Sequence, residues 1–353
     1  MENNEQEIDF LAIGDIVNDD FVALKDVRVF EDRDGVSMIA MRFGDKIPYE
    51  SRELIRAVGN SPNAATSATR LGLRTSIMTH VGDDELGEKT TKALAERNVD
   101  TSFITTEAGK ITNYHFVLRH KAERTILIKH EEYTYDLAKQ TEGKPTPKWV
   151  YFSSVGENSM QYHHDIAAWV KEAGIKMAFQ PGTFQIKLGY EPLKDIYEAT
   201  ELFFCNVEEA ERILIPVIGE AAINTNRESS ANNRKGQVAF LIQEMRKLGP
   251  NIVCITDGPG GAYAYDGTDG WYIPMYPDPS TPVDRTGAGD SFSSTFTSAL
   301  ILGKGLDEAL RWGPINSMSV VQHVGAQAGL LERAKLEEFL ADAPADYVAE
   351  KLI

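Results

Sequence analysis

One short segment combines the residue types that bind an anion with an adjacent carboxylate: Asp284-Arg285-Thr286-Gly287-Ala288-Gly289-Asp290. It leads directly into small and apolar residues that predict a helix. Gly287 and Gly289 let main-chain N–H groups approach a ligand closely, and a helix N-terminus carries partial positive charge. Asp290 lies in the first turn of this helix. A carboxylate there can accept a proton from an attacking hydroxyl while the amides stabilise a transferring phosphoryl group.

Taken alone, this segment is equally a turn with an acidic residue that complements the helix dipole. Three other clusters bear on the choice, although each also has a structural explanation. Residues 58–65 form a glycine-led loop into a helix, with asparagines that can bind hydroxyls or cap the helix. Residues 206–209 (NVEE) have the spacing of a capping box. Residues 256–261 (TDGPGG) form a glycine-rich turn after an apolar strand.

Other catalytic and metal-binding motifs are not found. The sequence contains no GxxxxGK[ST], HExxH, GxSxG or EF-hand pattern. Its seven histidines show no metal-ligand spacing with a third partner, which favours surface or core roles for them.

The composition excludes several classes of function. The 353 residues are 42% hydrophobic and 25% charged, as in a globular protein that buries a core. The formal net charge of −17 argues against nucleic-acid binding and against binding to an anionic membrane. A helix N-terminus removes the conflict between this acidity and a phosphate ligand, because it binds an anion without basic side chains.

The two cysteines and the chain start point to a cytoplasmic protein. Cys205 and Cys254 lie in apolar runs and cannot form a disulfide framework, so we expect buried, reduced thiols. The first ten residues lack the features of a signal peptide, and no apolar run reaches the length of a membrane span.

Apolar periodicity predicts alternating strands and helices that position these clusters. Strands are expected at 8–17, 75–81, 149–154, 175–180, 201–205 and 251–256, with a hairpin at 262–266 and 271–275. Helices are expected at 62–71, 84–97, 160–173, 191–198, 206–214, 236–248, 288–302, 306–324 and 334–341. This alternation is typical of a mainly parallel sheet covered by helices on both faces.

Two regions depart from the alternation. Short β segments within 101–130 predict a small sheet inserted into the alternating chain. Residues 224–235 are polar and lack apolar anchors, which predicts a mobile surface loop.

In order along the chain, the clusters resemble the PfkB/ribokinase family of carbohydrate and nucleoside kinases. The similarity runs from about Asp9 to Leu330. The pieces that carry it are Gly14–Asp19, Gly59–Asn63, Leu71-Gly72, Val81–Gly87, Asn206–Glu209, Thr256–Gly261, Asp284–Asp290, and Asn316 with Val324–Gln327.

The resemblance implies a ribokinase-like three-layer α/β/α fold with a mainly parallel sheet and a small β-sheet lid. It implies a single domain over residues 1–353, with the lid formed by about 18–50 and 101–130. It also implies a homodimer formed through the lids.

The resemblance also implies roles for individual residues. Asp290 would be the base, and Gly287, Ala288 and Gly289 the anion hole. Substrate hydroxyls would be bound by Asp19, Gly59, Asn60 and Asn63. The nucleotide and magnesium would lie near Asn206, Glu209, Thr256, Gly258, Gly261 and the stretch from Asn316 to Gln327, with Glu209 holding Mg²⁺ through water. A monovalent cation such as K⁺ is a further expectation.

Several positions depart from the family pattern. Val58 replaces the first glycine of a usual pair, and Gln180-Pro181-Gly182 replaces a turn with Asp or Asn. Arg285 replaces a small residue, and it either contacts phosphate or offsets Asp284.

The resulting hypothesis is an ATP-dependent kinase that phosphorylates a hydroxyl of a sugar. The alternative is a nucleoside kinase, in which Tyr114-His115-Phe116 and Phe184 would stack on a base. A phosphosugar acceptor is a further variant, with Arg119, Lys121, Arg124 and Lys129 as basic candidates. A remote alternative is a sensor that binds a sugar or nucleotide without catalysis.

Overall fold

Strands and helices alternate along most of the chain. The computed structural model describes residues 7–121 and 123–353. The strands are β1 (Phe10–Ile13), β2 (Val17–Leu24), β3 (Arg28–Glu31), β4 (Ser37–Ala40), β5 (Tyr49–Val58), β6 (Thr75–Gly82), β7 (Ile104–Glu107), β8 (Tyr114–His120), β9 (Glu123–Leu127), β10 (Trp149–Phe152), β11 (Lys176–Phe179), β12 (Leu202–Asn206), β13 (Ile252–Thr256), β14 (Ala262–Tyr265), β15 (Gly270–Ile273) and β16 (Glu350–Lys351).

The helices largely follow the predicted ranges. They are α1 (Asn60–Arg70), α2 (Glu85–Glu96), α3 (Leu137–Thr141), α4 (Met160–Ala173), α5 (Thr183–Leu188), α6 (Lys194–Ala199), α7 (Val207–Ile218), α8 (Glu220–Ser229), α9 (Arg234–Lys247), α10 (Ala288–Ile301), α11 (Leu306–Val320) and α12 (Arg333–Ala341), with 3₁₀ helices η1 (Glu191–Leu193) and η2 (Gly258–Gly260).

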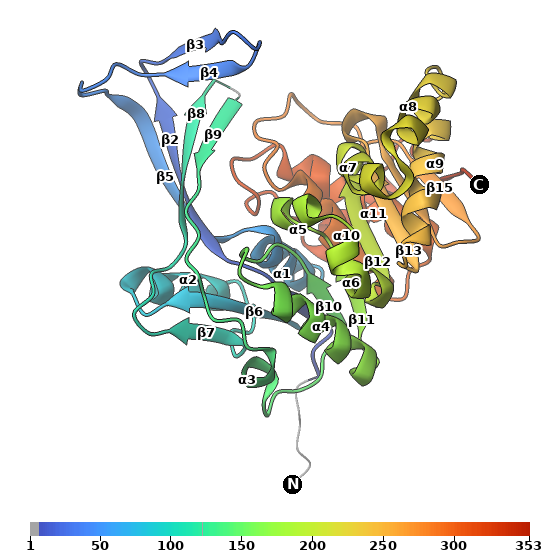
Figure 1. Ribbon diagram of the computed structural model, residues 1–353, viewed down its shortest axis with the longest axis horizontal. Helices are drawn as coiled ribbons and strands as arrows, with labels where there is room; N and C mark the ends of the chain where they lie inside the picture. Colours follow the sequence, from blue (N-terminus) through green and yellow to red (C-terminus); the bar gives the residue numbers. More distant parts are fainter. Residues whose placement is uncertain (1–6, 122) are drawn as a thin grey trace.

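The large sheet has the strand order β16-β15-β14-β13-β12-β11-β10-β1-β6-β7 (Figure 1). Its strands from β7 to β13 run parallel, and β14 to β16 add an antiparallel edge. The carboxyl ends of the parallel strands therefore meet at one edge of the sheet. In open α/β sheets, ligands bind outside this edge.

Side chains alternate between the two faces of the sheet, which gives two cores. In β1, Leu11 and Ile13 pack with α4, α6, α7 and α9, whereas Phe10 and Ala12 pack with α1, α10 and α11. A strand that is buried on both faces has a continuous apolar sequence, and β1 has one, Phe-Leu-Ala-Ile. This is the predicted three-layer α/β/α arrangement.

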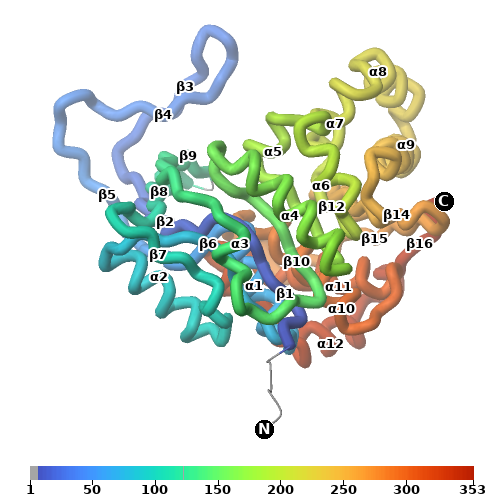
Figure 2. Tube along the Cα trace, turned by 60° about the horizontal axis from the view of Figure 1, so that its bottom comes forward, coloured from blue at the N-terminus to red at the C-terminus, as the bar shows by residue number. Residues whose placement is uncertain are grey.

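The lid, as used below, is the four-stranded sheet β5-β2-β8-β9 with the β3–β4 hairpin that projects from it (Figure 2). Its boundaries differ from those expected. β7 pairs with β6 in the large sheet, so the first part of 101–130 lies outside the lid. β5 extends the lid to Val58, beyond residue 50.

The single strand expected over 8–17 is wrong. The chain leaves the large sheet after Ile13, and β2 belongs to the lid. A Cβ at Gly14 would lie 2.3 Å from Ser61 Oγ and 2.7 Å from Ser153 Oγ, so distant segments meet the backbone there.

The loop expected over 224–235 is also wrong, because α8 continues to Ser229 and α9 begins at Arg234. Ile223 is fully buried, and Arg227 Nε donates to Glu211 Oε1 at 2.9 Å. The buried Ile223 and the ion pair of Arg227 thus stabilise a helix in a segment whose polar composition predicts a loop.

Within the described residues, no helix has the length and apolar character needed to span a membrane. Cys205 and Cys254 are buried and free. Burial raises the pKa of both thiols, as expected for core residues.

Candidate active site

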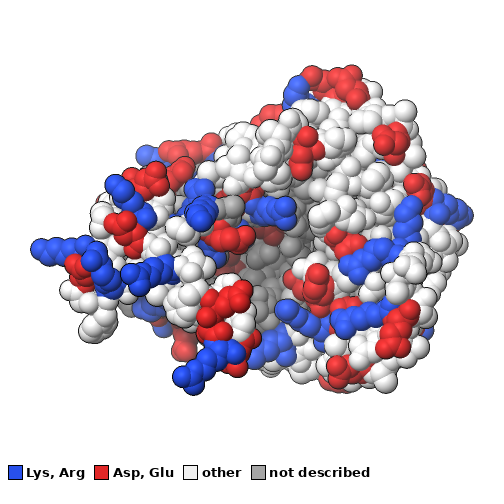
Figure 3. All heavy atoms as spheres, turned by 90° about the horizontal axis from the view of Figure 1, so that it is seen from above, with Lys and Arg blue, Asp and Glu red and all other residues white. Residues whose placement is uncertain are grey.

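A cavity of about 790 Å³ lies between the lid and the carboxyl ends of the parallel strands. Its size suits a small-molecule ligand. Figure 3 shows a hollow between the two parts of the molecule, with acidic and basic side chains at its rim. The residues singled out from the sequence that line the cavity are Asp19, Gly59, Asn60, Asn63, Glu209 and Asp290.

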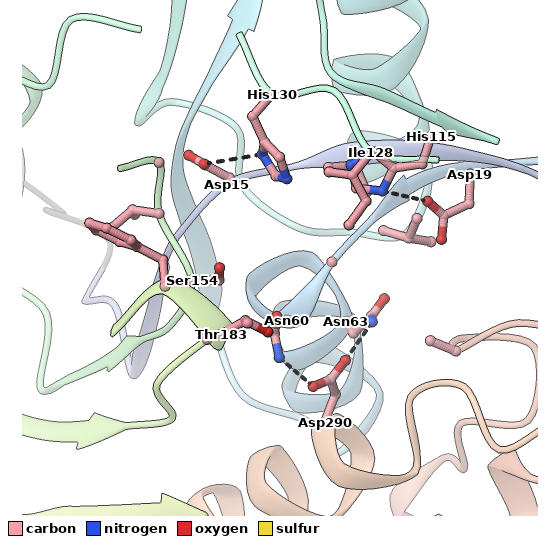
Figure 4. A pocket seen from close by; sticks show the side chains of 18 of the residues that line it. Asp15, Asp19, Asn60, Asn63, His115, Ile128, His130, Ser154, Thr183 and Asp290 are labelled. Atoms are coloured by element: carbon pink, nitrogen blue, oxygen red, sulfur yellow. Dashed lines mark hydrogen bonds and ion pairs between the residues drawn. The ribbon is translucent and has the colours of Figure 1, made fainter. Parts of the chain in front are cut away.

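The carboxylate of Asp290 is held by three side-chain amides, and Figure 4 shows two of them, those of Asn60 and Asn63. Asn60 Nδ2 donates to Oδ1 and Asn63 Nδ2 donates to Oδ2, both at 2.8 Å. Gln180 Nε2 donates to Oδ1 at 3.1 Å. Burial raises the pKa of Asp290, and the three amides oppose this shift. The carboxylate therefore binds a proton more readily than a free aspartate, as a general base requires.

Gln180, noted from sequence only as a departure, is oriented by its own partners. Tyr151 Oη donates to Gln180 Oε1, and Ser293 Oγ donates to the same oxygen at 3.1 Å. Because the oxygen accepts two hydroxyls, the NH₂ group must face Asp290. No local motif reveals this residue, since its partners lie on β10 and α10.

The start of α10 places main-chain N–H groups beside Asp290. Gly287 precedes the helix with φ of 79°, and no side chain among the described residues caps the helix. A Cβ at Gly287 would lie 2.3 Å from that of Ala326, so glycine allows this close packing. A Cβ at Gly289 would have Gln180 Nε2 as its nearest neighbour, at 3.9 Å, so the space beside Gly289 is open. An anion site requires a helix start without a side-chain cap, as found here. Ala288 N donates to the Arg285 carbonyl oxygen at 3.4 Å, and Gly287, Ala288 and Gly289 are not among the residues that line the cavity.

Asp284 fixes this loop in place. Its Oδ1 accepts from Thr286 N at 2.9 Å and Thr286 Oγ1 at 2.7 Å, and its Oδ2 accepts from Gly325 N at 3.0 Å. Arg124 of β9 lies 3.5 Å from Asp284, which links the lid to the loop. Among the described residues, Arg285 is exposed and forms no ion pair with Asp284, so it does not offset that charge directly.

Asp19 contributes a carboxylate from the lid side of the cavity. His115 Nδ1 lies 3.3 Å from Asp19 Oδ1, without hydrogen-bond geometry. Asp19 Oδ1 and His115 Nε2 are both buried and find no hydrogen-bond partner among the described residues. Buried polar atoms normally have partners, so this pair fits hydroxyl groups of a ligand.

Asn206 and Glu209 form the capping box that their spacing predicts. Asn206 Oδ1 accepts from Glu209 N, and Glu209 Oε2 accepts from Asn206 N, both at 2.9 Å. Glu209 also lines the cavity, and burial raises the pKa of its carboxyl group, with a smaller contribution from the Asp290 charge. Its position near Asp290 suits a role with a cation.

The glycine-rich turn lies outside the cavity lining. Thr256 is paired with Asn206 across β12 and β13, and the turn follows it. A Cβ at Gly261 would lie 2.2 Å from the Ile273 carbonyl oxygen, so glycine allows the turn to pack on β15. Gly258 faces open space. A role for these three residues toward a nucleotide stays a prediction.

The role expected for Asn316 needs correction, since its side chain is fully buried. Its Nδ2 donates to Thr295 Oγ1 at 2.8 Å, and its Oδ1 accepts from Leu331 N at 2.9 Å. Contact with a nucleotide would break these bonds. Gln327 is also buried, and its Nε2 donates to Asn63 Oδ1 at 2.8 Å, so it positions Asn63.

Asp15 is a cavity residue that the sequence did not single out. Its side chain is 6% exposed, and Tyr135 Oη donates to its Oδ1 at 2.8 Å. Burial raises the pKa of Asp15 to about 7, although Tyr135 and the Gly156 amide oppose the shift. Two sequence signals point to it: it lies in the Gly14–Asp19 segment that carries the family resemblance, and it follows β1 at the edge where ligands bind.

Comparison with known proteins assigns the family. A model described as pfkB family carbohydrate kinase matches residues 36–333. Because this match covers well over half of the chain, the protein belongs to the PfkB family, whose members are phosphotransferases with an alcohol group as acceptor.

Individual relatives are distant but match over most of their length. Ribokinase of Haemophilus influenzae is 25% identical over 289 residues, 81% of this chain and 87% of the relative. The 5-dehydro-2-deoxygluconokinase of Bacillus licheniformis is 24% identical over 351 residues, which cover 96% of this chain and 98% of the relative. Arabidopsis thaliana ribokinase complexed with ribose and ATP has a TM-score of 0.74 at 18% identity, covering 95% of this chain and 99% of that chain. The predicted ribokinase-like α/β fold is thus confirmed.

The Gln180 contact predicts a change in the pH dependence of catalysis. Gln180→Leu removes a donor that lowers the pKa of Asp290, so this pKa should rise. The acidic limb of kcat/KM should move to higher pH, with activity recovering above it. The pH–rate profiles of both proteins measure this, and coincident acidic limbs would contradict the assigned contact.

The buried Asp15 predicts a pH-dependent effect on stability. Its pKa is about 7 in the folded chain against 3.8 for an ordinary aspartate, so the folded state binds more protons between these two values. The free energy of unfolding should therefore fall as pH rises from about 4 to 7. Asp15→Asn removes this penalty, so its stability relative to wild type should increase between pH 5 and pH 8.

Chemical denaturation at both pH values measures the difference. Asp346→Asn, at an exposed position, is the control and should follow the wild type. A constant difference between Asp15→Asn and wild type at the two pH values would show that Asp15 is not buried as described.

Proposed function

We propose that this protein transfers the γ-phosphoryl group of ATP to a hydroxyl of a sugar, with Asp290 as the base. One observation supports this most strongly: a buried carboxylate, held by three amides, lies inside a cavity beside an uncapped helix start. Phosphoryl transfer needs both an acid–base group and an anion site. A protein that only binds its ligand does not need the two side by side.

The reaction follows from the positions of these groups. The acceptor hydroxyl would lie against Asp290, whose pKa is raised by burial. As the oxygen attacks the γ-phosphorus, its proton passes to the carboxylate and the bond to the β-phosphate oxygen breaks. The main-chain N–H groups of Gly287, Ala288 and Gly289 would stabilise the charge on the transferring group. Asp19, Asn60 and Asn63 would orient the acceptor.

Mg²⁺ suits this site as a companion of the nucleotide. The described residues contain no cluster of three acidic, His or Cys ligands, so the chain supplies no complete metal cage. Mg²⁺ commonly keeps waters and is held by one or two carboxylates together with substrate phosphates. Glu209 would hold it through water, with one carboxylate oxygen already bonded to Asn206. When bound, the ion neutralises charge on the phosphates.

A nucleoside acceptor is the second candidate, favoured by Phe21 and Phe184 in the cavity lining. Of the other residues expected to stack on a base, His115 lines the cavity, whereas Tyr114 and Phe116 do not. Tyr114 Oη donates to Asp20 Oδ2 at 2.6 Å, and Phe116 is exposed on the lid. Stacking would therefore depend on the two phenylalanines and on the imidazole of His115.

Asp290→Asn tests the proposal. We expect ATP-dependent ADP formation with the preferred acceptor to fall by about 10²- to 10⁴-fold, as for loss of a general base. Folding and ATP binding should persist, because the amide has nearly the same shape. Coupled assay of ADP over a panel of sugars and nucleosides measures turnover and identifies the acceptor class. Asp346→Asn serves as the surface control, and near-normal turnover by Asp290→Asn would refute the role of the base.

The proposal includes a homodimer formed through the lid. Large apolar side chains are exposed on the lid: Val29, Phe30, Met38, Met41, Phe43, Phe116, Ile126 and Leu127. Phe116 and Leu127 are 46% and 53% exposed and lie opposite each other on β8 and β9. Apolar residues gathered on one part of a surface are typical of an interface.

The oligomeric state can be changed at this pair. Phe116→Glu combined with Leu127→Glu should convert a dimer to a monomer, because two charges would be buried in an apolar contact. Light scattering after size exclusion measures the mass. Val217→Glu, at an exposed apolar position on α7, should leave it unchanged. A monomeric wild type, or a dimer in the double variant, would contradict the proposal.

A further inference from the structure

We infer that the acceptor carries a protonated amine, and that this group binds the carboxylate of Asp15 in the active-site cavity. The inference rests on the proposed function, because it names the class of acceptor for the same site. Its basis is the charge of the cavity lining together with the incomplete bonding of Asp15.

The lining is acidic and offers little to an anion. Its acidic members are Asp15, Asp19, Glu131, Glu132, Glu157, Glu209 and Asp290. Among the described residues, Lys187 is its one lysine or arginine, and its side chain is exposed. Glu131 is partly neutralised by Lys110 at 3.4 Å. A phosphosugar would meet repulsion here, whereas a cationic group would be attracted.

Asp15 lacks a counter-charge. Its one side-chain hydrogen bond from the described residues is donated by Tyr135 to Oδ1, although the Asp15 side chain is only 6% exposed. His130 Nδ1 lies 3.8 Å away, beyond hydrogen-bond distance. Burial lowers the pKa of His130, with a smaller contribution from His115, so this imidazole is neutral at pH 7. A buried carboxylate without a cation is costly, and a ligand ammonium group would complete it.

The carboxylate is also held in place for a ligand. Gly156 N donates to Tyr135 Oη at 2.9 Å, and Tyr135 Oη donates to Asp15 Oδ1. A Cβ at Gly156 would lie 2.9 Å from Tyr135 Oη, so glycine allows the main chain to approach the hydroxyl that holds Asp15. Asp15 and Asp290 both line the cavity, and Figure 4 shows Asp15 beside His130 and Asp290 beside Asn60 and Asn63. One acceptor can therefore meet the base with a hydroxyl and Asp15 with an amine.

Matched acceptor pairs test the inference. D-Glucosamine is compared with D-glucose, and 1-amino-1-deoxy-D-fructose with D-fructose, by ATP-dependent ADP formation and by thermal-shift binding. The amine should be preferred in at least one pair. Asp15→Asn should lower kcat/KM for the amine by about 10- to 100-fold, the range for a charge-assisted hydrogen bond. Its effect on the neutral sugar should be smaller, and Asp346→Asn should not change the preference.

A second variant guards against a folding defect in Asp15→Asn. Tyr135→Phe keeps the charge but removes the hydroxyl that orients it, so it should weaken the preference for the amine without abolishing it. Equal use of both members of every pair, or a preference that Asp15→Asn leaves intact, would overturn the inference while sugar phosphorylation stands. ADP at background with every acceptor would overturn the proposed function. In that case the thermal shifts alone would test the inference. It would stand if the amine stabilised the wild type but not Asp15→Asn, and it would fail otherwise.

Discussion

The site depends on a balance between burial of the Asp290 carboxylate and the amides that donate to it. Removal of Asp290 from water favours its neutral form, and the amides of Asn60, Asn63 and Gln180 each oppose that shift. If Asp290 were more exposed, its pKa would be lower and the carboxylate would be a weaker base. If fewer amides donated to it, its pKa would be higher and the carboxyl group would be protonated more easily. The amides come from α1 and from the loop after β11, so the ionisation of one side chain depends on the packing of several elements.

The rest of the fold serves this constraint. Parallel strands bring their carboxyl ends to one edge, where the residues that follow β1, β11 and β12 meet the start of α10. Asp284 fastens the loop before α10 to Gly325, and Arg124 connects the same loop to the lid. The amides of a helix start supply positive potential, so an acidic chain can bind phosphate without placing lysine or arginine beside the base.

The sequence predicts what depends on local pattern. Apolar periodicity predicts most elements of the large sheet, and residues 58–63 and 284–290 predict the segments that meet at the Asp290 carboxylate. The roles of Asp290 as a base and of the helix start as an anion site are proposals. What it misses depends on distant contacts. Residues 220–229 form a helix because Arg227 pairs with Glu211 and Ile223 is buried. Gln180 and Asp15 gain their roles from Tyr151, Ser293 and Tyr135, which lie far away in sequence. Asn316 matches a motif but serves packing.

A crystal structure with a non-hydrolysable ATP analogue and the preferred acceptor tests the central claim most directly. The account predicts the γ-phosphate against the N–H groups of Gly287, Ala288 and Gly289. It also predicts one acceptor hydroxyl within hydrogen-bond distance of Asp290, with the three amides still in contact with this carboxylate. A triphosphate bound elsewhere, or an acceptor whose hydroxyls all lie away from Asp290, would contradict it.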